Sequence, residues 1–147
     1  YGVRMKQSDE INEPCMVNIT HSIFENNDTG ISLRNAICNA DSNILQKNKI
    51  AIWLKEGVII KIVNNTIKDN TKGIFFTNTP KIRITKNNIF GNNYNIYLGE
   101  NQKEDIDALN NWWGSAVPEE IEKKILDQKW DSSLGTVNYI PFLHNPN

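Results

Sequence analysis

A repeat of 22 residues constrains the fold of this chain more than any other feature of its sequence. Asn26, Asn48, Asn70 and Asn92 follow one another at this interval, and an Ile or Leu stands three residues before each of them. Further apolar residues recur in the same register in each copy. A unit of this length cannot bury its apolar side alone, whereas stacked copies form one continuous core. The repeat therefore predicts a solenoid.

The apolar residues within each copy alternate with a period of two. Examples are the segments 60–62, 74–76, 82–84 and 96–98, in which the first and third residues are aliphatic or aromatic. This alternation indicates strands, because successive side chains of a strand point to opposite faces. The 23 Asn and 21 Ile residues agree, since Asn favours turns and Ile favours strands. We predict an all-β parallel β-helix with 22-residue coils that rise by about 4.8 Å each.

Repeated asparagines predict structural ladders at the corners of the coils. One set comprises Asn26, Asn48, Asn70 and Asn92, and a second set comprises Asn43, Asn65 and Asn87, with His21 in the first copy. Asn tolerates the left-handed conformation of turns, and stacked amides can hydrogen-bond along the axis. The first copy contains one extra residue and offers Ile31 and Leu33 to the core. A leucine-rich repeat is disfavoured, because no Leu-rich strand with a helical return is found.

The last third of the chain breaks the repeat and predicts a cap. We expect residues 15–100 to form four coils, residues 1–14 to be a lead-in left from an upstream coil, and residues 101–147 to cover the end. An amphipathic helix is predicted over 118–128, where Pro and acidic residues start the segment. The segment Trp112, Trp113 and Gly114 is expected to close the last coil, with large rings and a tight turn. Open strand edges at the N-terminal end predict upstream coils or end-to-end self-association.

The repeats resemble the "nNtI..N..gI.l" unit of right-handed parallel β-helix proteins. The resemblance rests on the phrases at 23–26, 65–74 and 88–92, and on a C-terminal ending that runs from Asn111 to Leu143. Such repeats occur in pectate-lyase-like and NosD-like proteins and in carbohydrate-binding and sugar-hydrolase (CASH) domains. The resemblance implies the right-handed sense of the helix and a bacterial or archaeal location that is extracellular, cell-surface or periplasmic. It does not specify the function, because one fold hosts many chemistries.

The acidic residues of the repeats do not form a pattern typical of glycosidases. Glycosidase chemistry needs two carboxylates about 5–9.5 Å apart. The column of Glu25, Lys47, Asp69 and Gly91 separates its two acids with a lysine. Lys61 and Arg83, which stand 22 residues apart, could serve a lyase, but a solvated sheet face explains them better. We predict no catalytic residues, and leave open whether a longer protein is an enzyme.

The residues with affinity for soft metals lack a diagnostic spacing. NosD-like relatives are associated with copper-centre assembly, and Cys15, Met16 and His21 are close in sequence. Two packed side chains and a surface histidine account for them better, so no metal site or cofactor is predicted. Cys15 and Cys38 can be two buried thiols or form one bridge.

An aromatic column is the strongest candidate for a binding site. If Ile52, Ile74 and Ile96 point inward, Trp53, Phe75 and Tyr97 point outward in one column on consecutive coils. Sugar rings pack on such aromatic faces, so the column predicts contact with carbohydrate. The alternatives are that the cap or another subunit covers the column, or that it is simply exposed.

We therefore expect a non-catalytic module of the surface or periplasm that binds polysaccharide or acts as a rigid unit of a longer protein. The alternatives are the C-terminal part of a polysaccharide lyase, hydrolase or epimerase, and a NosD-like accessory protein of metal assembly. A formal charge of −1 disfavours nucleic acid as a partner. No apolar stretch approaches the roughly 20 residues that a membrane-spanning helix needs.

Overall fold

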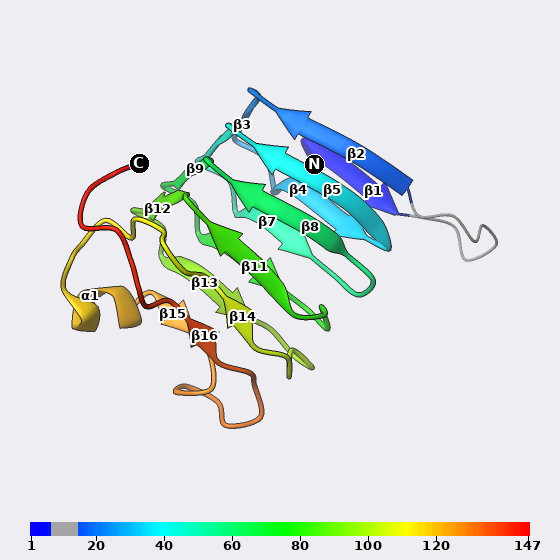
Figure 1. Cartoon of the computed structure of the whole chain (residues 1–147). Coiled ribbons are helices and arrows are strands. Elements are labelled where there is room, and N and C mark those ends of the chain that lie inside the picture. The colour runs from blue at the N-terminus through cyan, green and yellow to red at the C-terminus, as the bar shows by residue number, and fades with distance from the viewer. Residues whose placement is uncertain (7–14) are drawn as a thin grey trace.

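Short apolar runs separated by polar corners wind this chain into a parallel β-solenoid of about four turns. The computed structural model describes residues 1–6 and 15–147 (Figure 1). The predicted all-β solenoid with coils of about 22 residues is confirmed. Among the described residues no helix is both long and apolar enough to cross a bilayer.

Three parallel sheets, called sheets A, B and C, form the sides of the solenoid. Sheet A contains β1 (Val3–Lys6), β4 (Thr29–Arg34), β7 (Ile50–Leu54), β10 (Lys72–Phe76), β13 (Tyr94–Leu98) and β15 (Ile125–Leu126). Sheet B contains β2 (Cys15–Thr20), β5 (Ala36–Asp41), β8 (Ile59–Val63), β11 (Ile82–Thr85), β14 (Ile106–Asp107) and β16 (Val137–Asn138). Sheet C contains β3 (Ile23–Glu25), β6 (Ile44–Gln46), β9 (Thr66–Lys68) and β12 (Asn88–Phe90). Each coil therefore passes through sheets B, C and A in turn.

The core is a set of apolar columns that run along the solenoid axis. Ile31, Ile52, Ile74 and Ile96 pair in register along sheet A and are fully buried. The column beside it contains Leu33, Leu54, Phe76 and Leu98, all at most 1% exposed. Because similar apolar side chains stack on one another in successive coils, each coil buries the apolar side that it could not bury alone.

Left-handed residues turn the chain at all three corners of the coil. Each corner can turn sharply because one residue adopts a positive φ, which Gly and Asn accept most readily. The residues with positive φ are Asn35, Gly57, Asn78 and Asn101 between sheets A and B, His21, Ser42, Asn64, Lys86 and Asn110 between B and C, and Asn26, Lys47, Asp69, Gly91 and Gly114 between C and A.

Amide ladders run along two of these corners, one residue after each left-handed position. Asn48 donates from its backbone N–H and its Nδ2 to Asn70 Oδ1, at 2.9 and 3.0 Å. Asn70 repeats both bonds to Asn92 Oδ1 at 2.9 Å. A parallel ladder at the B–C corner joins Asn43, Asn65, Asn87 and Asn111. The ladders satisfy corner backbone groups that the sheets cannot reach.

The expectation that the first copy contains one extra residue is wrong: the first coil is one residue shorter than those that follow, with a spacing of 21 rather than 22 residues. This changes two assignments made from the sequence. Asn27 rather than Asn26 binds Asn48 Oδ1, through its backbone N–H at 2.9 Å and its Nδ2 at 3.1 Å. Ser22 rather than His21 occupies the equivalent place at the other corner and donates its backbone N–H to Asn43 Oδ1. Asn26 and His21 are instead the left-handed residues of their corners. The spacing between the first two coils is thus 21 residues, as the pairing of Ile31 with Ile52 shows.

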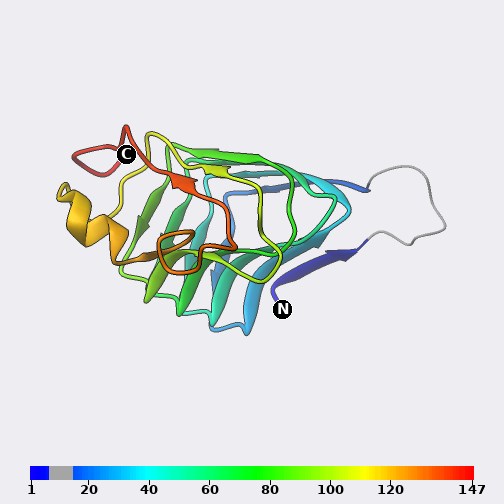
Figure 2. The same ribbon diagram turned by 90° about the horizontal axis from the view of Figure 1, so that it is seen from below.

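The segment after residue 100 continues the solenoid as well as ending it. Strands β14, β15 and β16 extend sheets A and B, and Trp112 forms an isolated parallel bridge to Asn88 of sheet C. Helix α1 (Pro118–Glu122) is shorter than the predicted range of 118–128, because Ile125 and Leu126 pair with β13 as a strand. Figure 2 shows α1 and the C-terminus at the end of the solenoid opposite to β1. In the N-terminal lead-in, residues 3–6 form β1, and residues 7–14 lie outside the described residues.

Candidate functional site

The outer face of sheet A carries the three aromatic residues that the repeat predicts to form a column. Trp53, Phe75 and Tyr97 are register partners on β7, β10 and β13, and each is half-buried. The Trp53 and Phe75 rings stack with centroids 5.4 Å apart and planes inclined by 25°. Phe75 and Tyr97 meet edge to face at the same separation. The strands thus hold the rings as one continuous aromatic surface, which we call the aromatic column.

Two lysines lie over the aromatic column. Lys55 Nζ stands 3.8 Å from the centroid of the Trp53 ring. Lys72 Nζ stands 4.3 Å from the Phe75 centroid and 3.8 Å from the Tyr97 centroid. Burial lowers the pKa of Lys72, and it also lowers the pKa of Lys55, with repulsion from Arg4 and Arg34 as a further cause. The lysines were not predicted from the sequence, because neither recurs at one position of the repeat.

A pocket of about 780 Å³ adjoins the C-terminal half of the aromatic column. Phe75 and Tyr97 line one side, and the loop after β15 provides Trp130, Asp131 and Ser133 on the other. Trp130 is 63% exposed, so its indole can be reached from solvent. Asp131 accepts hydrogen bonds from the backbone N–H and the Oγ of Ser133, and these bonds lower its pKa. The C-terminal segment therefore forms a wall beside the column rather than a cover over it.

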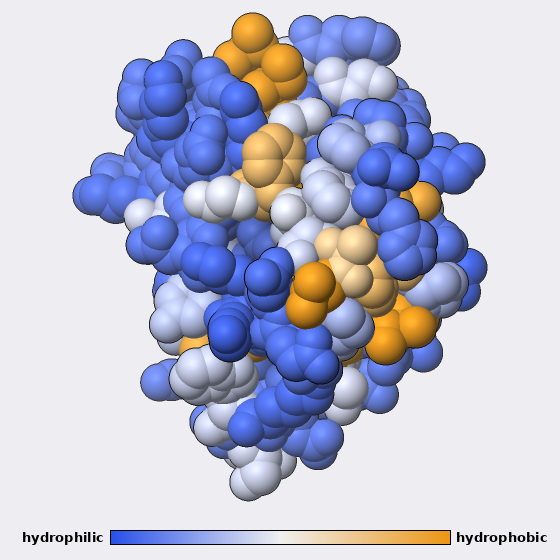
Figure 3. Space-filling model, turned by 90° about the vertical axis from the view of Figure 1, so that its left-hand side faces the viewer, coloured by the Kyte–Doolittle hydropathy of each residue, from blue (hydrophilic) through white to orange (hydrophobic). Residues whose placement is uncertain are grey.

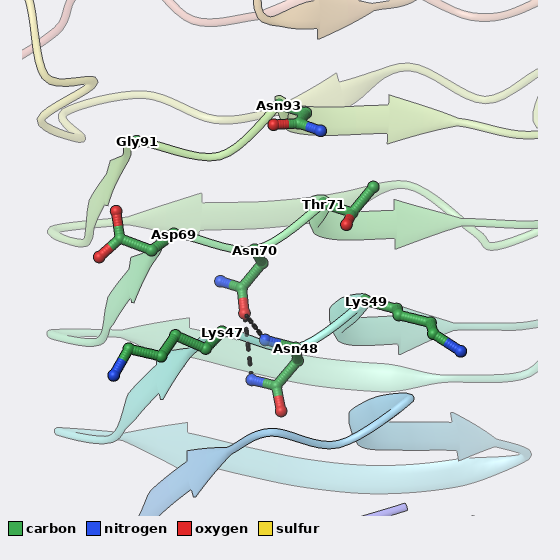
Figure 4. Close-up of a pocket in the computed structure, with 8 residues that line it drawn as sticks. All are labelled: Lys47, Asn48, Lys49, Asp69, Asn70, Thr71, Gly91 and Asn93. Carbon is green, nitrogen blue, oxygen red and sulfur yellow. Dashed lines mark hydrogen bonds between the residues drawn. The ribbon is translucent and has the colours of Figure 1, made fainter.

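A second, shallower pocket of about 400 Å³ lies over the corner between sheets C and A. Its lining includes Lys47, Lys49 and Asp69 around the ladder residues Asn48 and Asn70, as Figure 4 shows. Lys47 pairs with Glu25 at 2.9 Å, and Lys49 pairs with Asp28. Because both cations already have carboxylate partners, this corner has less unsatisfied charge than sheet A.

The side that carries sheet C and α1 is mostly hydrophilic, with separate small apolar areas (Figure 3). Large apolar side chains exposed on these elements or beside them include Ile23, Ile44 and Val117. They do not form an aromatic surface comparable to that of sheet A. We therefore take the outer face of sheet A as the candidate site.

The other residues singled out in the sequence are dispersed over the molecule. Lys61 and Arg83 are exposed on the outer face of sheet B, where Arg83 is the register partner of Asp107. Trp113 is 3% exposed in the core, and Trp112 is half-buried. Gly114 has a φ of 85° and leaves no room for a Cβ atom, which would lie 2.8 Å from Phe90 Cβ.

The soft-metal donors do not gather at one place in the described residues. Met16 is 76% exposed on the outer face of sheet B, whereas Cys38 is a free thiol buried inside the same sheet. His21 lies at a corner, and the side chain of Cys15 is outside the described part of the structure. Burial raises the pKa of Cys38 to about 11, which disfavours the thiolate that binds metals. Within the described residues, no three His, Cys, Asp or Glu side chains are grouped to hold a metal ion.

A comparison with known protein families shows to which family this chain belongs. A family model described as "Periplasmic copper-binding protein (NosD)" matches residues 1–142. The chain belongs to the NosD family. This is a family of right-handed β-helices, which agrees with the resemblance in the repeats. No curated protein and no solved structure matches this NosD-family chain.

Proposed function

We propose that this NosD-family chain is a non-catalytic β-helix module of the periplasm that binds polysaccharide on the outer face of sheet A. The observation that carries the proposal is the aromatic column of Trp53, Phe75 and Tyr97, held in register on three consecutive strands. The family's description as periplasmic supports this location. Flat aromatic rings bind the apolar faces of sugars because both lose water on contact.

The dimensions of the face suit a chain-like ligand. The rings follow the solenoid axis at strand spacing, so from Trp53 to Tyr97 the column extends roughly 10 Å. The adjoining pocket of about 780 Å³ lies within the usual size of small-ligand sites and offers Trp130 as a further ring. A polysaccharide could therefore contact several rings at once. No single contact would then need to be strong.

Asp131, which lines the pocket beside the column, is suited to binding rather than to acid catalysis. A general acid needs a carboxyl whose pKa is raised toward neutrality. The hydrogen bonds from Ser133 instead lower the pKa of Asp131, which lines the pocket. Asp131 is thus suited to accept hydrogen bonds from sugar hydroxyls.

We predict that the triple variant Trp53→Ala/Phe75→Ala/Tyr97→Ala loses polysaccharide binding. Removing residues of a central contact typically costs at least 2 kcal/mol, so affinity should fall by at least about 30-fold. Affinity electrophoresis in gels containing a polysaccharide panel measures the loss, with folding checked by circular dichroism. Phe90→Ala on sheet C is the matched control, because it removes a half-buried ring away from the column. Equal binding by the wild type and the folded triple variant would refute the proposal.

Copper binding is the second candidate, and the family match is the observation that favours it. The described donors do not fit a copper site, since Met16 and Cys38 lie on opposite faces of sheet B.

We predict that the purified chain, dialysed after loading with copper, retains much less than one ion per molecule by atomic absorption. The physical reason is that Met16 and Cys38 lie on opposite faces of sheet B and that, in the part of the chain that the structure describes, no three His, Cys, Asp or Glu side chains are grouped to hold a metal ion. Retention of one equivalent would contradict this prediction. A Met16→Leu variant would then test whether the exposed thioether contributes.

A further inference from the structure

Basic side chains surround the aromatic column at its N-terminal end. Arg4, Ser32 and Trp53 are consecutive register partners, so the column of the rings continues toward Arg4. Lys6 is the register partner of Arg34 in the neighbouring column of outward-facing residues. The backbone N–H of Lys55 donates to Leu33 O at 3.0 Å, which places Lys55, directly after β7, beside Arg34.

These residues line a groove that has an excess of positive charge. The groove has a volume of about 180 Å³ and is lined by Arg4, Lys6, Arg34, Lys55 and one acidic residue, Glu56. Glu56 forms an ion pair with Arg34. The remaining cations of the groove have no salt bridge to a carboxylate in the described residues. The local excess contrasts with the formal charge of −1 of the whole chain.

The lysine over Trp53 connects this groove with the aromatic column. Lys55 lies over the ring while it also lines the groove, and Lys72 provides a second cation over Phe75 and Tyr97. Crowding with Arg4 and Arg34 is one cause of the lowered pKa of Lys55. An anion bound beside Lys55 would relieve this repulsion. The aromatic column and the basic groove therefore form one continuous surface that carries both rings and cations.

We infer that the polysaccharide bound by sheet A is acidic, with its sugar rings on the aromatic column and its carboxylate or sulfate groups beside Lys55, Lys72 and the basic groove. This inference rests on the proposed function. Charge complementarity is its basis, because a neutral glycan would desolvate several cations without providing them with a counter-ion. A single-stranded nucleic acid would also offer rings and charges, so it is included in the test.

The test uses pairs of polymers that share a backbone and differ in charge. Suitable pairs are carboxymethyl-cellulose with hydroxyethyl-cellulose, and hyaluronan with carboxyl-reduced hyaluronan. We expect the chain to bind an acidic polymer at least tenfold more tightly than its neutral partner in 50 mM salt. Adding 500 mM salt should remove most of this preference, since it screens charges at the surface.

The variant Lys55→Met/Lys72→Met removes both charges over the rings and keeps the aliphatic stems. It should lose about tenfold in affinity for the acidic polymer and retain its affinity for the neutral one. Lys86→Met is the matched control, because Lys86 is an exposed corner lysine away from sheet A. Circular dichroism checks that both variants are folded.

The outcomes separate this inference from the proposed function. Equal binding of the acidic and neutral polymers, lost in the aromatic triple variant, would overturn the inference and leave the proposed function intact. If the chain binds neither these polymers nor any polysaccharide of the panel used for the aromatic triple variant, the inference and the proposed function are both overturned. Tighter binding of an oligothymidylate than of every acidic glycan, with the same dependence on Lys55 and Lys72, would overturn both in favour of nucleic acid.

Discussion

Replacing Asn70 with alanine is expected to lower the free energy of unfolding by about 3–5 kcal/mol. The two N–H groups of Asn70 Nδ2 are shared among three acceptors, Leu45 O at 3.0 Å, Lys68 O at 2.9 Å and Asn92 Oδ1 at 2.9 Å. Its Oδ1 accepts two bonds from Asn48, as Figure 4 shows. Each such bond contributes about 0.5–1.5 kcal/mol net, and a buried group left unpaired costs about 1–3 kcal/mol.

Urea denaturation followed by circular dichroism and by tryptophan fluorescence measures the effect, provided that the two transitions coincide. Asn93→Ala is the matched control, since Asn93 is exposed and bonds to Asn70 only through its backbone N–H. It should change stability by no more than about 0.5 kcal/mol. A loss in Asn70→Ala below about 1 kcal/mol would show that water replaces the ladder bonds at little cost.

The repeat predicts the positions that stack, because stacking requires the same residue type at the same place in each coil. The pairing of Ile52 with Ile74 and Ile96 follows directly from their spacing of 22 residues. The register of Trp53, Phe75 and Tyr97 follows from the same spacing, because these residues alternate with the core residues. Whether the column binds sugar is a separate chemical question that spacing does not answer.

The register of the first coil could not be deduced from residue types. Asn26 and Asn27 are adjacent, and either can continue a column of asparagines. The choice depends on which amide reaches Asn48, and that in turn depends on the 21-residue spacing of the strands. Hydrogen bonds between coils thus decide between two residues that are locally equivalent.

The end of α1 shows tertiary pairing overriding a local pattern. Ile121, Ile125 and Leu126 have helical spacing, which predicts a helix through residue 128. Ile125 instead pairs with Ile96, and Leu126 pairs with Tyr97, at the exposed edge of β13. A five-residue helix has little stability of its own. Residues 125–126 therefore hydrogen-bond to the edge of sheet A instead of extending the helix.

The candidate binding face could be predicted only in part from the sequence. Lys55 and Lys72 lie at different distances from their aromatic neighbours along the chain, so they do not form a repeated motif. Trp130 approaches the column only through the fold of the C-terminal segment. Contacts made between coils or across the end of the solenoid therefore contribute features that a one-dimensional repeat does not contain.

Phe75 and Phe76 are adjacent in the chain, but one belongs to the aromatic column and the other to the core. Phe76 is fully buried in the core column, whereas Phe75 points outward and is half-buried in the aromatic column. We expect Phe76→Ala to lower the free energy of unfolding by about 3–5 kcal/mol, because it leaves a cavity among stacked apolar residues. Phe75→Ala should cost only about 1 kcal/mol, through lost aromatic and cross-strand contacts.

The effects of the same two variants on polysaccharide affinity should have the opposite order to their effects on stability. Phe75→Ala removes the central ring of the column and should weaken polysaccharide binding at temperatures where the protein is folded. Phe76→Ala should retain the affinity of the wild type at temperatures where the variant is still folded. Denaturation curves and affinity electrophoresis on the same preparations test both expectations. Loss of binding in folded Phe76→Ala with retention in Phe75→Ala would contradict the assignment of sheet A, because binding would then depend on the core side of the strand rather than its outer face.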